Sequence, residues 1–214
     1  MNDVGDFRTL ADERTDGVAR RPVAMFYRAA LACRQPGSQP DGLDRLQQAI
    51  EEFRSINHLG RLPYYLSVLA DAFMQRGRVD DAEATIRAAL DVAREHSEDW
   101  CRPELLRIQA AIVNGRGRVN EAEALLVESL ALAQKIGALS WRLRAASDLA
   151  RLWSSRSKPD AARAMLLPIF NEFTEGFSTL DLVIARSLLA PHTPQDGDVS
   201  AAPEARRATA RSIR

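Results

Sequence analysis

Apolar residues in the central part of the chain recur at steps of three and four positions, which is the spacing of one face of an α-helix. One series runs from Val68 to Phe73, and a second runs from Ala82 to Ala93. Gly77 lies between them, and glycine adopts the left-handed conformation that commonly ends a helix. The pattern therefore predicts two helices joined by a tight turn.

This pattern repeats every 40 residues. The segment from Leu69 to Leu90 has the layout of the segment from Gln109 to Leu130, and the layout returns more loosely from Leu149 to Phe170. A degenerate earlier copy occupies about residues 24 to 57. Self-similarity at such a period is the signature of a solenoid, in which stacked units bury their apolar faces. The matching positions are Ala70, Ala110 and Ala150; Gly77, Gly117 and Ser157; Ala82, Ala122 and Ala162; and Ile86, Leu126 and Leu166.

The repeat predicts an all-α fold, a right-handed α-α superhelix of about four helical hairpins and a C-terminal capping helix. We expect nine helices and no strand within residues 22–190. Asp80 and Asp81 are suited to the start of one second helix, and Ser178 is the expected N-cap of the last helix, with Asp181 three residues later. Residues 1–21 and the tail at 191–214 are expected to be disordered, because the tail has little apolar content.

The repeat resembles the tetratricopeptide repeat (TPR), although its period is longer than the usual 34 residues. A second resemblance covers about residues 40–190. It depends on the segments "LGRLPYYLSVLADAFMQRGRVDDAEATI", "PELLRIQA", "LRAASDLARLW" and "FNEFTEGFSTLDLVIARSLL". These segments are similar to the C-terminal helical-repeat region of bacterial signalling ATPases and adenylate-cyclase-type regulators. In that family the region follows a nucleotide-binding domain, to which nothing in this sequence is similar. The TPR positions are occupied by Leu66, Leu69, Ala70, Phe73, Gly77, Ala82, Ile86 and Ala89.

The charge balance argues against nucleic acid as the main partner, because 29 basic and 29 acidic side chains cancel. No apolar run approaches the roughly 20 residues needed to span a membrane. Cys33 and Cys101 are too few and too far apart for a disulfide framework or a zinc site. We therefore expect a cytoplasmic protein with reduced thiols.

Motifs for catalysis are missing from the sequence. The glycines at 115 and 117 begin like a phosphate-binding loop but lack the following lysine, and a helix turn is the better interpretation. The three histidines, His58, His96 and His192, are isolated from one another. We predict no catalytic residue, no cofactor and no metal, and hence no enzyme.

A binding surface is expected on the concave side, where the first helices of successive repeats lie. Three arginines in this set favour an acidic peptide or metabolite, because guanidinium groups bind carboxylates in a bidentate manner. Tyr64 would add an apolar anchor. The alternative is that the arginines pair with Glu104 and Asp148 of the chain itself. The predicted surface comprises Tyr64, Asp71, Gln75, Glu104, Arg107, Asn114, Arg144, Ser147 and Arg151.

Two functions follow from this architecture. The first is a non-catalytic protein-interaction or sensory scaffold in bacterial signalling, and the alternative is a small-molecule-sensing domain that controls a separate nucleotide-dependent enzyme or transcription factor. If the chain derives from a longer solenoid, its first helix would expose Phe26, Tyr27 and Leu31 and support a homodimer. Replacing Arg107, Arg144 and Arg151 together by glutamine is expected to remove partner binding at constant melting temperature.

Overall fold

The computed structural model describes residues 20–34, 41–57, 59–97 and 99–190. The predicted disordered tail at 191–214 and residues 1–19 of the predicted N-terminal segment lie outside this part of the chain. Within the described ranges there are nine α-helices, one 3-10 turn and no strand. The elements are α2 (Arg20–Arg34), α3 (Asp41–Ser55), α4 (Leu62–Gln75), α5 (Val79–Glu95), η1 (Asp99–Cys101), α6 (Arg102–Gly115), α7 (Val119–Lys135), α8 (Leu139–Ser155), α9 (Pro159–Phe170) and α10 (Leu180–Leu189).

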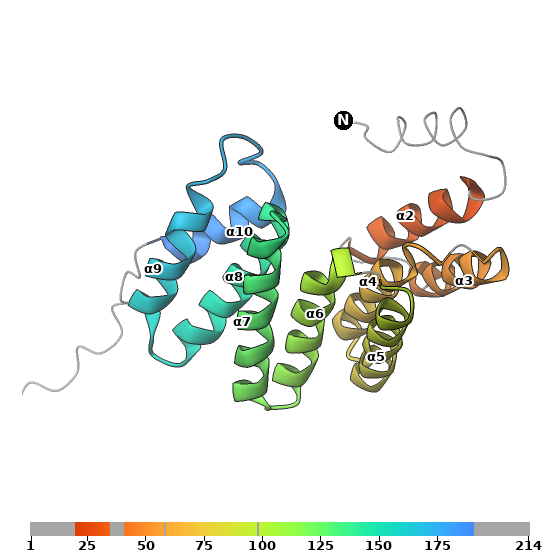
Figure 1. Ribbon diagram of the computed structural model, residues 1–214, viewed down its shortest axis with the longest axis horizontal. Helices are drawn as coiled ribbons and strands as arrows, with labels where there is room; N and C mark the ends of the chain where they lie inside the picture. The colour runs from red at the N-terminus through yellow and green to blue at the C-terminus, as the bar shows by residue number, and fades with distance from the viewer. Residues whose placement is uncertain (1–19, 35–40, 58, 98, 191–214) are drawn as a thin grey trace, which may run out of the picture.

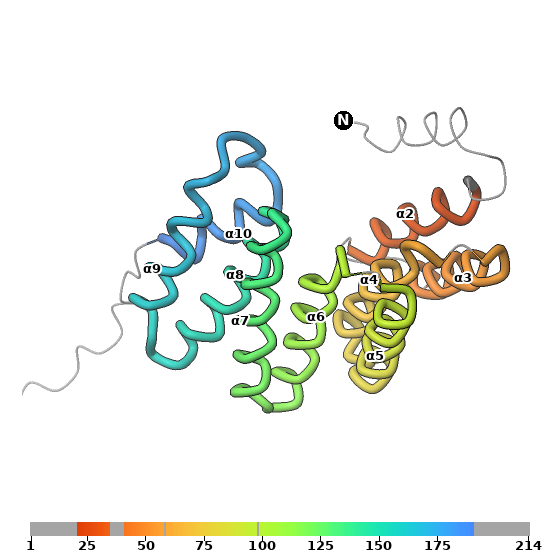
Figure 2. Tube along the Cα trace, viewed as in Figure 1, coloured from red at the N-terminus to blue at the C-terminus, as the bar shows by residue number. Residues whose placement is uncertain are grey.

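The helices pair in chain order into four hairpins, α2–α3, α4–α5, α6–α7 and α8–α9, which stand side by side in Figures 1 and 2. The first helices of the hairpins also contact one another, so that α2, α4, α6 and α8 form one row. Helix α10 packs against α8 and α9 and extends this row. The predicted all-α solenoid of four hairpins and a capping helix is confirmed.

The turns follow a shorter period than the sequence indicated. Gly77, Gly117 and Ser157, the expected turn positions within the hairpins, have φ angles of 71°, 78° and 59°. The turns between hairpins use the same left-handed conformation midway between them, at Asn57, Ser97 and Gly137. A left-handed residue therefore recurs every 20 residues from Asn57 to Ser157. Because both kinds of turn have the same spacing, each helix and its turn form one structural unit.

The helix starts differ from the prediction in their capping. Asp80 and Asp81 lie in the first turn of α5, where a negative charge suits the helix dipole, but no side chain caps this helix. Asp81 instead accepts a hydrogen bond from Nε of Arg78 at 2.7 Å. The prediction of Ser178 as N-cap of α10 is wrong, because Thr179 holds that position and makes no side-chain cap bond.

Small residues allow the helices to approach closely, as the repeat indicated. Ala70, Ala82, Ala89 and Ala122 are fully buried at the helix interfaces. Because these positions carry only a methyl group, larger apolar residues can pack beside them in the same core clusters. Ile86 is one of these larger residues, and its side chain is buried.

The N-terminal hairpin does not expose the aromatic face that the sequence predicted. Phe26 is only 1% exposed, and its ring lies 4.3 Å from the ring of Tyr65, which in turn stacks on Phe53 at 4.4 Å between centroids. The expectation that Phe26 is available for dimerisation is therefore wrong, because α3 and α4 cover it. Leu31 is exposed, as predicted.

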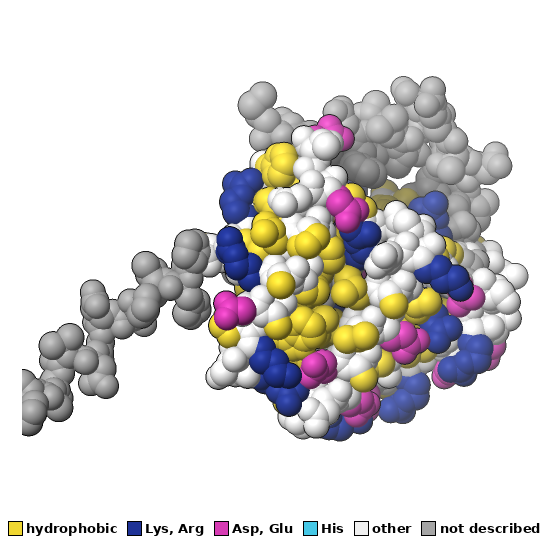
Figure 3. All heavy atoms as spheres, turned by 60° about the vertical axis from the view of Figure 1, so that its left-hand side comes forward, with side chains coloured by type: hydrophobic (Ala, Val, Ile, Leu, Met, Phe, Trp, Pro, Cys, Tyr) yellow, Lys and Arg dark blue, Asp and Glu magenta, His cyan; other side chains and the backbone are white. Residues whose placement is uncertain are grey.

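Exposed apolar side chains also gather over the C-terminal hairpin and α10 (Figure 3). Leu180 is 68% exposed, and Phe177 and Val183 are exposed beside it in the chain. The most exposed of the large apolar residues at this end thus belong to α10 and the segment that precedes it.

Candidate binding groove

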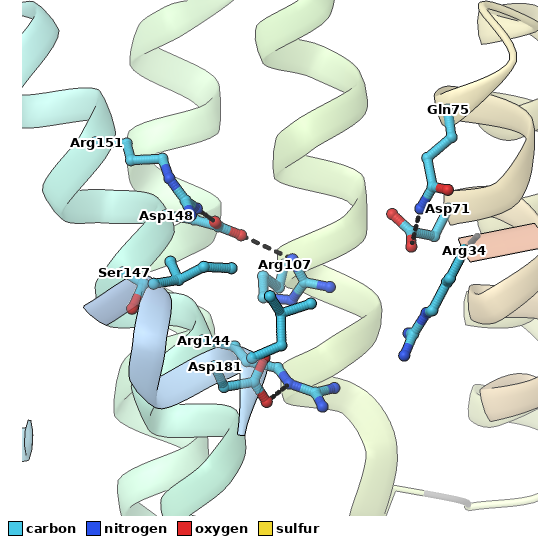
Figure 4. A pocket seen from close by; sticks show the side chains of 11 residues that line it. Arg34, Asp71, Gln75, Arg107, Arg144, Ser147, Asp148, Arg151 and Asp181 are labelled. Atoms are coloured by element: carbon cyan, nitrogen blue, oxygen red, sulfur yellow. Dashed lines mark hydrogen bonds and ion pairs between the residues drawn. The ribbon is translucent and has the colours of Figure 1, made fainter. Parts of the chain in front are cut away.

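A cavity of about 300 Å³ lies along the row of first helices, and its described lining residues belong to α2, α4, α6, α8 and α10 (Figure 4). Residues from four hairpins and the capping helix therefore meet at one place. Five further lining residues, Arg34, Asp148, Leu180, Asp181 and Ile184, were not among the predicted surface residues. The predicted surface contributes Asp71, Gln75, Arg107, Arg144, Ser147 and Arg151.

The helix register and the 40-residue period explain this convergence. Asp71 and Gln75 are four residues apart on α4 and share one helix face. Glu104 and Arg144 occupy the same repeat position in consecutive copies, so that they face each other from α6 and α8. Only the spacing of charges by 40 residues could have indicated such pairs in advance.

Glu104 is buried between two arginines that line the first cavity, Arg107 and Arg144. Its carboxylate accepts two hydrogen bonds of 2.9 Å from Arg107 and one of 3.3 Å from Arg144. The residue is 5% exposed, and this burial by itself raises the pKa of Glu104. The charges and hydrogen bonds of Arg107 and Arg144 outweigh burial and hold this pKa below its usual value. Glu104 is thus an internal counter-ion of these two arginines, and it is not among the residues that line the first cavity.

Arg107, Arg144 and Arg151 also donate hydrogen bonds to two further carboxylates of the chain. Arg107 donates from Nη1 to Asp148 at 2.7 Å, and Arg151 donates to the other oxygen of Asp148 at 2.5 Å. Arg144 donates from Nε to Asp181 of α10 at 2.7 Å. These contacts and those of Glu104 form a single network across α6, α8 and α10. Pairing within the chain, the alternative considered for these arginines, is what the structure shows.

Asp71 lies on the other side of the cavity and differs from the residues of this network. Its carboxylate accepts a hydrogen bond from Nε2 of Gln75 at 3.0 Å, and no cation of the described residues forms an ion pair with it. Burial raises the pKa of Asp71, while the more distant charges of Arg107 and Arg34 lower it in part. Arg34 lines the same cavity and likewise forms no ion pair with a described residue.

A second cavity, of about 680 Å³, adjoins the first and shares Arg107, Asp148 and Arg151 with it. Its lining is more apolar and includes Ala111 and Leu126. Asn114, another predicted surface residue, lines this second cavity. The two cavities together are called the groove below.

An aromatic row stands at the N-terminal ends of the first helices and consists of Tyr64, Trp100 and Trp141. The ring of Trp100 lies 5.9 Å from that of Tyr64 and 5.8 Å from that of Trp141, measured between centroids. Trp100 is 38% exposed, and Tyr64 and Trp141 are half-buried. Tyr64 is therefore part of a larger aromatic surface. The three rings come from three separate elements, so their contact depends on the packing of the hairpins.

Other kinds of site have little support in the described residues. They contain no group of three or more His, Cys, Asp or Glu side chains placed to hold a metal ion. None of their helices combines the length and the apolar character required to cross a bilayer. Cys33 and Cys101 are buried, and neither forms a disulfide with a described residue.

No protein-family model and no curated protein matches the sequence. Two solved structures of nearly identical TPR-like repeats, from a Podospora anserina protein described as a putative kinesin light chain, share its fold. One of them, a single-substitution form, has a TM-score of 0.58 and 16% identity, and the match covers 82% of this chain and 86% of that chain. The other has a TM-score of 0.55 and 18% identity, with coverages of 78% and 84%. The chain is thus a TPR-like helical solenoid.

Proposed function

We propose that this chain is a non-catalytic scaffold that binds a protein or peptide in its groove. The observation that carries this proposal is the convergence of side chains from α2, α4, α6, α8 and α10 on one cavity. A ligand lying there touches every hairpin of the solenoid, as an extended peptide can. The aromatic row beside it offers apolar contacts of the kind that dominate binding energy at protein interfaces.

The ion-pair network supports this role by holding the helices in position. Arg144 links Glu104 on α6 to Asp181 on α10, and Arg107 links Glu104 to Asp148 on α8. A surface whose shape exists before binding loses less conformational entropy when the ligand arrives. An acidic partner residue would have to displace Asp148 or Asp181 from an arginine, which makes these positions selective for strongly complementary ligands.

The setting of this activity is proposed from the sequence. The resemblance over about residues 40–190 favours the repeat part of a bacterial signalling ATPase or a cyclase-type regulator, working in the cytoplasm. In that setting, partner binding by the solenoid would report to an attached or separate nucleotide-dependent domain.

Small-molecule sensing is the second candidate function, and the cavity volumes favour it. Cavities of about 300 and 680 Å³ lie in the range of small-ligand sites, although the first has a strongly charged lining. Calorimetric titration with metabolites would give saturable heat if this second function is correct.

The proposed function is tested by selecting peptides from a display library on the purified protein. Ala111→Trp places a bulky ring in the groove from an exposed position of α6 and should abolish binding of the selected peptides. Ala131→Trp, at an exposed position of α7 outside the groove, is the matched control and should bind as the unmodified chain does. Equal binding by both variants would place the site elsewhere, and the recovery of no peptide would contradict the proposal.

A further inference from the structure

The charged side chains that line the first cavity differ in whether they have an ion-pair partner within the chain. Arg107, Arg144 and Arg151 each have a carboxylate partner within the chain, and so each of these arginines is neutralised. Asp71 is the carboxylate of this lining that has no cationic partner among the described residues. Figure 4 shows Asp71 and Gln75 on α4, across the cavity from Arg107 and Arg144.

The surroundings of Asp71 suit a bound cation. An ionised carboxylate can accept about four hydrogen bonds, and the one recorded here comes from the amide of Gln75. This bond orients the carboxylate and leaves acceptor sites open. A partly buried charge without a partner is unfavourable, and a cationic donor would remove this cost.

The cations of the described residues do not supply this donor. The guanidinium of Arg107 is already directed to Glu104 and Asp148 through Nε, Nη1 and Nη2. Arg34 lines the cavity from the end of α2 but makes no ion pair with Asp71. Within the described part of the chain the donor site of Asp71 is thus open to a ligand.

We propose that Asp71 binds a basic side chain, lysine or arginine, of the peptide that occupies the groove, with Gln75 orienting the carboxylate. This proposal rests on the proposed function and specifies its ligand. The basic side chain enters the cavity and donates its N–H groups to the open oxygen sites of Asp71.

The aromatic row sets a second requirement on the same peptide. Tyr64 and Asp71 are seven residues apart on α4, which corresponds to about 10 Å along the helix axis. An extended peptide advances by about 3.3 Å per residue. A peptide that runs along α4 would therefore carry an apolar or aromatic residue about three positions from its basic residue.

The test is a display-library selection on the full chain and two variants at position 71. The unmodified protein should enrich peptides with Lys or Arg at one recurrent position. For one such synthetic peptide, Asp71→Asn should lower the affinity by about 10- to 100-fold, the range expected for a lost charged hydrogen bond, as measured by fluorescence anisotropy. Asp71→Lys should enrich Asp or Glu at that same position.

The control is Asp91→Asn, which makes the same chemical change at an exposed position of α5, outside the groove. It should select and bind the same basic peptides as the unmodified protein. Circular dichroism melts establish that the variants at position 71 are folded, and Asp71→Asn carries the test should Asp71→Lys not fold.

Two results would overturn this inference and leave the proposed function intact. One is the enrichment of groove-binding peptides without a recurrent basic residue, and the other is unchanged affinity of Asp71→Asn for the basic peptide. The absence of any peptide selected by the unmodified protein would overturn the inference together with the proposed function.

Discussion

The two walls of the groove use their charged residues in different ways. On the wall formed by α6, α8 and α10, Glu104 and Asp148 are each shared by two arginines. On the wall formed by α2 and α4, neither Asp71 nor Arg34 has an ion-pair partner among the described residues. One wall is therefore neutralised internally, while the other keeps charges that a ligand can contact.

This difference decides whether a charged residue contributes mainly to the stability of the fold or to ligand binding. A buried ion pair recovers its desolvation cost from its own partner, and removing one member leaves the other charge buried and uncompensated. A partly buried charge without a partner recovers this cost only when a ligand binds. Substitutions on the paired wall should therefore affect stability, and substitutions of Asp71 should affect binding.

The largest effect is expected for Glu104→Gln. This change leaves Arg107 and Arg144 without their shared buried counter-ion, and it should lower the free energy of unfolding by about 3–5 kcal/mol. Urea denaturation measures the loss. Glu128→Gln is the control, because its exposed pair with Arg102 is worth at most about 1 kcal/mol. Equal stability of the two variants would remove the distinction between the walls.

The pairing of Glu104 also predicts a pH dependence. Because the pKa of Glu104 is lowered in the folded state, its stabilisation is present above the ordinary glutamate pKa and is lost as the pH falls through the lowered value. The unmodified chain should thus lose stability in acid more steeply than Glu104→Gln. Parallel slopes of stability against pH would contradict this assignment.

The joint replacement of Arg107, Arg144 and Arg151 by glutamine is expected to behave differently from the prediction made on sequence alone. It leaves the buried Glu104 without its two arginine partners, so that the melting temperature should fall instead of staying constant. The fall should be about as large as that of Glu104→Gln, measured by a thermal melt. This variant therefore cannot report on binding alone, and an unchanged melting temperature would mean that the network contributes little.

A smaller effect on the free energy of unfolding is expected for leucine substitutions of two buried alanines, one in the α4–α5 hairpin and one in the α6–α7 hairpin. Ala82→Leu overpacks the α4–α5 interface and should cost about 1–3 kcal/mol of unfolding free energy. Ala122→Leu should cost less, because Ala122 lines the second cavity and a larger side chain can enter it. Denaturant titration of both variants tests this order, and a larger loss for Ala122→Leu would contradict it.

The next smaller effect is expected on the affinity for a basic peptide when Arg34 is replaced. Arg34→Gln removes a positive charge from the wall to which a basic peptide is proposed to bind. Because exposed like charges repel by less than about 1 kcal/mol, binding should strengthen by about twofold to fivefold. Anisotropy titration at low salt measures the change, and weaker binding would show that Arg34 holds part of the ligand.

The smallest effect on stability is expected for Asp71→Asn. Because burial raises the pKa of Asp71, the folded state favours its protonated form, and the stability contributed by this group falls as the pH rises through that pKa. Asparagine removes this loss, so the variant should be as stable as the unmodified chain in acid and up to about 1 kcal/mol more stable at neutral pH. Melting temperatures across this pH range provide the test, and a clear loss at neutral pH would indicate that Asp71 supports the fold.

Much of the fold follows from local pattern. The 40-residue period located the hairpins, and Gly77 and Gly117 marked turns that only a left-handed residue can make without strain. The turn residues Asn57 and Ser97 were harder to recognise, because they are not glycine and adopt this conformation at some energetic cost. Six of the nine predicted surface residues line the first cavity, since repeat position determines the direction of a side chain on a stacked helix.

The tertiary structure alone decided how the charges are used. Arg144 and Asp181 are 37 residues apart, and the segment between α9 and α10 interrupts the repeat, so that no period relates them. Asp181 accepts this hydrogen bond from α8, and the start of α10 has no side-chain cap bond. Burial of Phe26 likewise depends on contacts with Phe53 and Tyr65 from two other helices. Sequence by itself determined the helices, their order and the face that lines the groove, because these depend on local periodicity. Packing alone sets the distances between helices. These distances decide which charges are neutralised and which remain for a ligand.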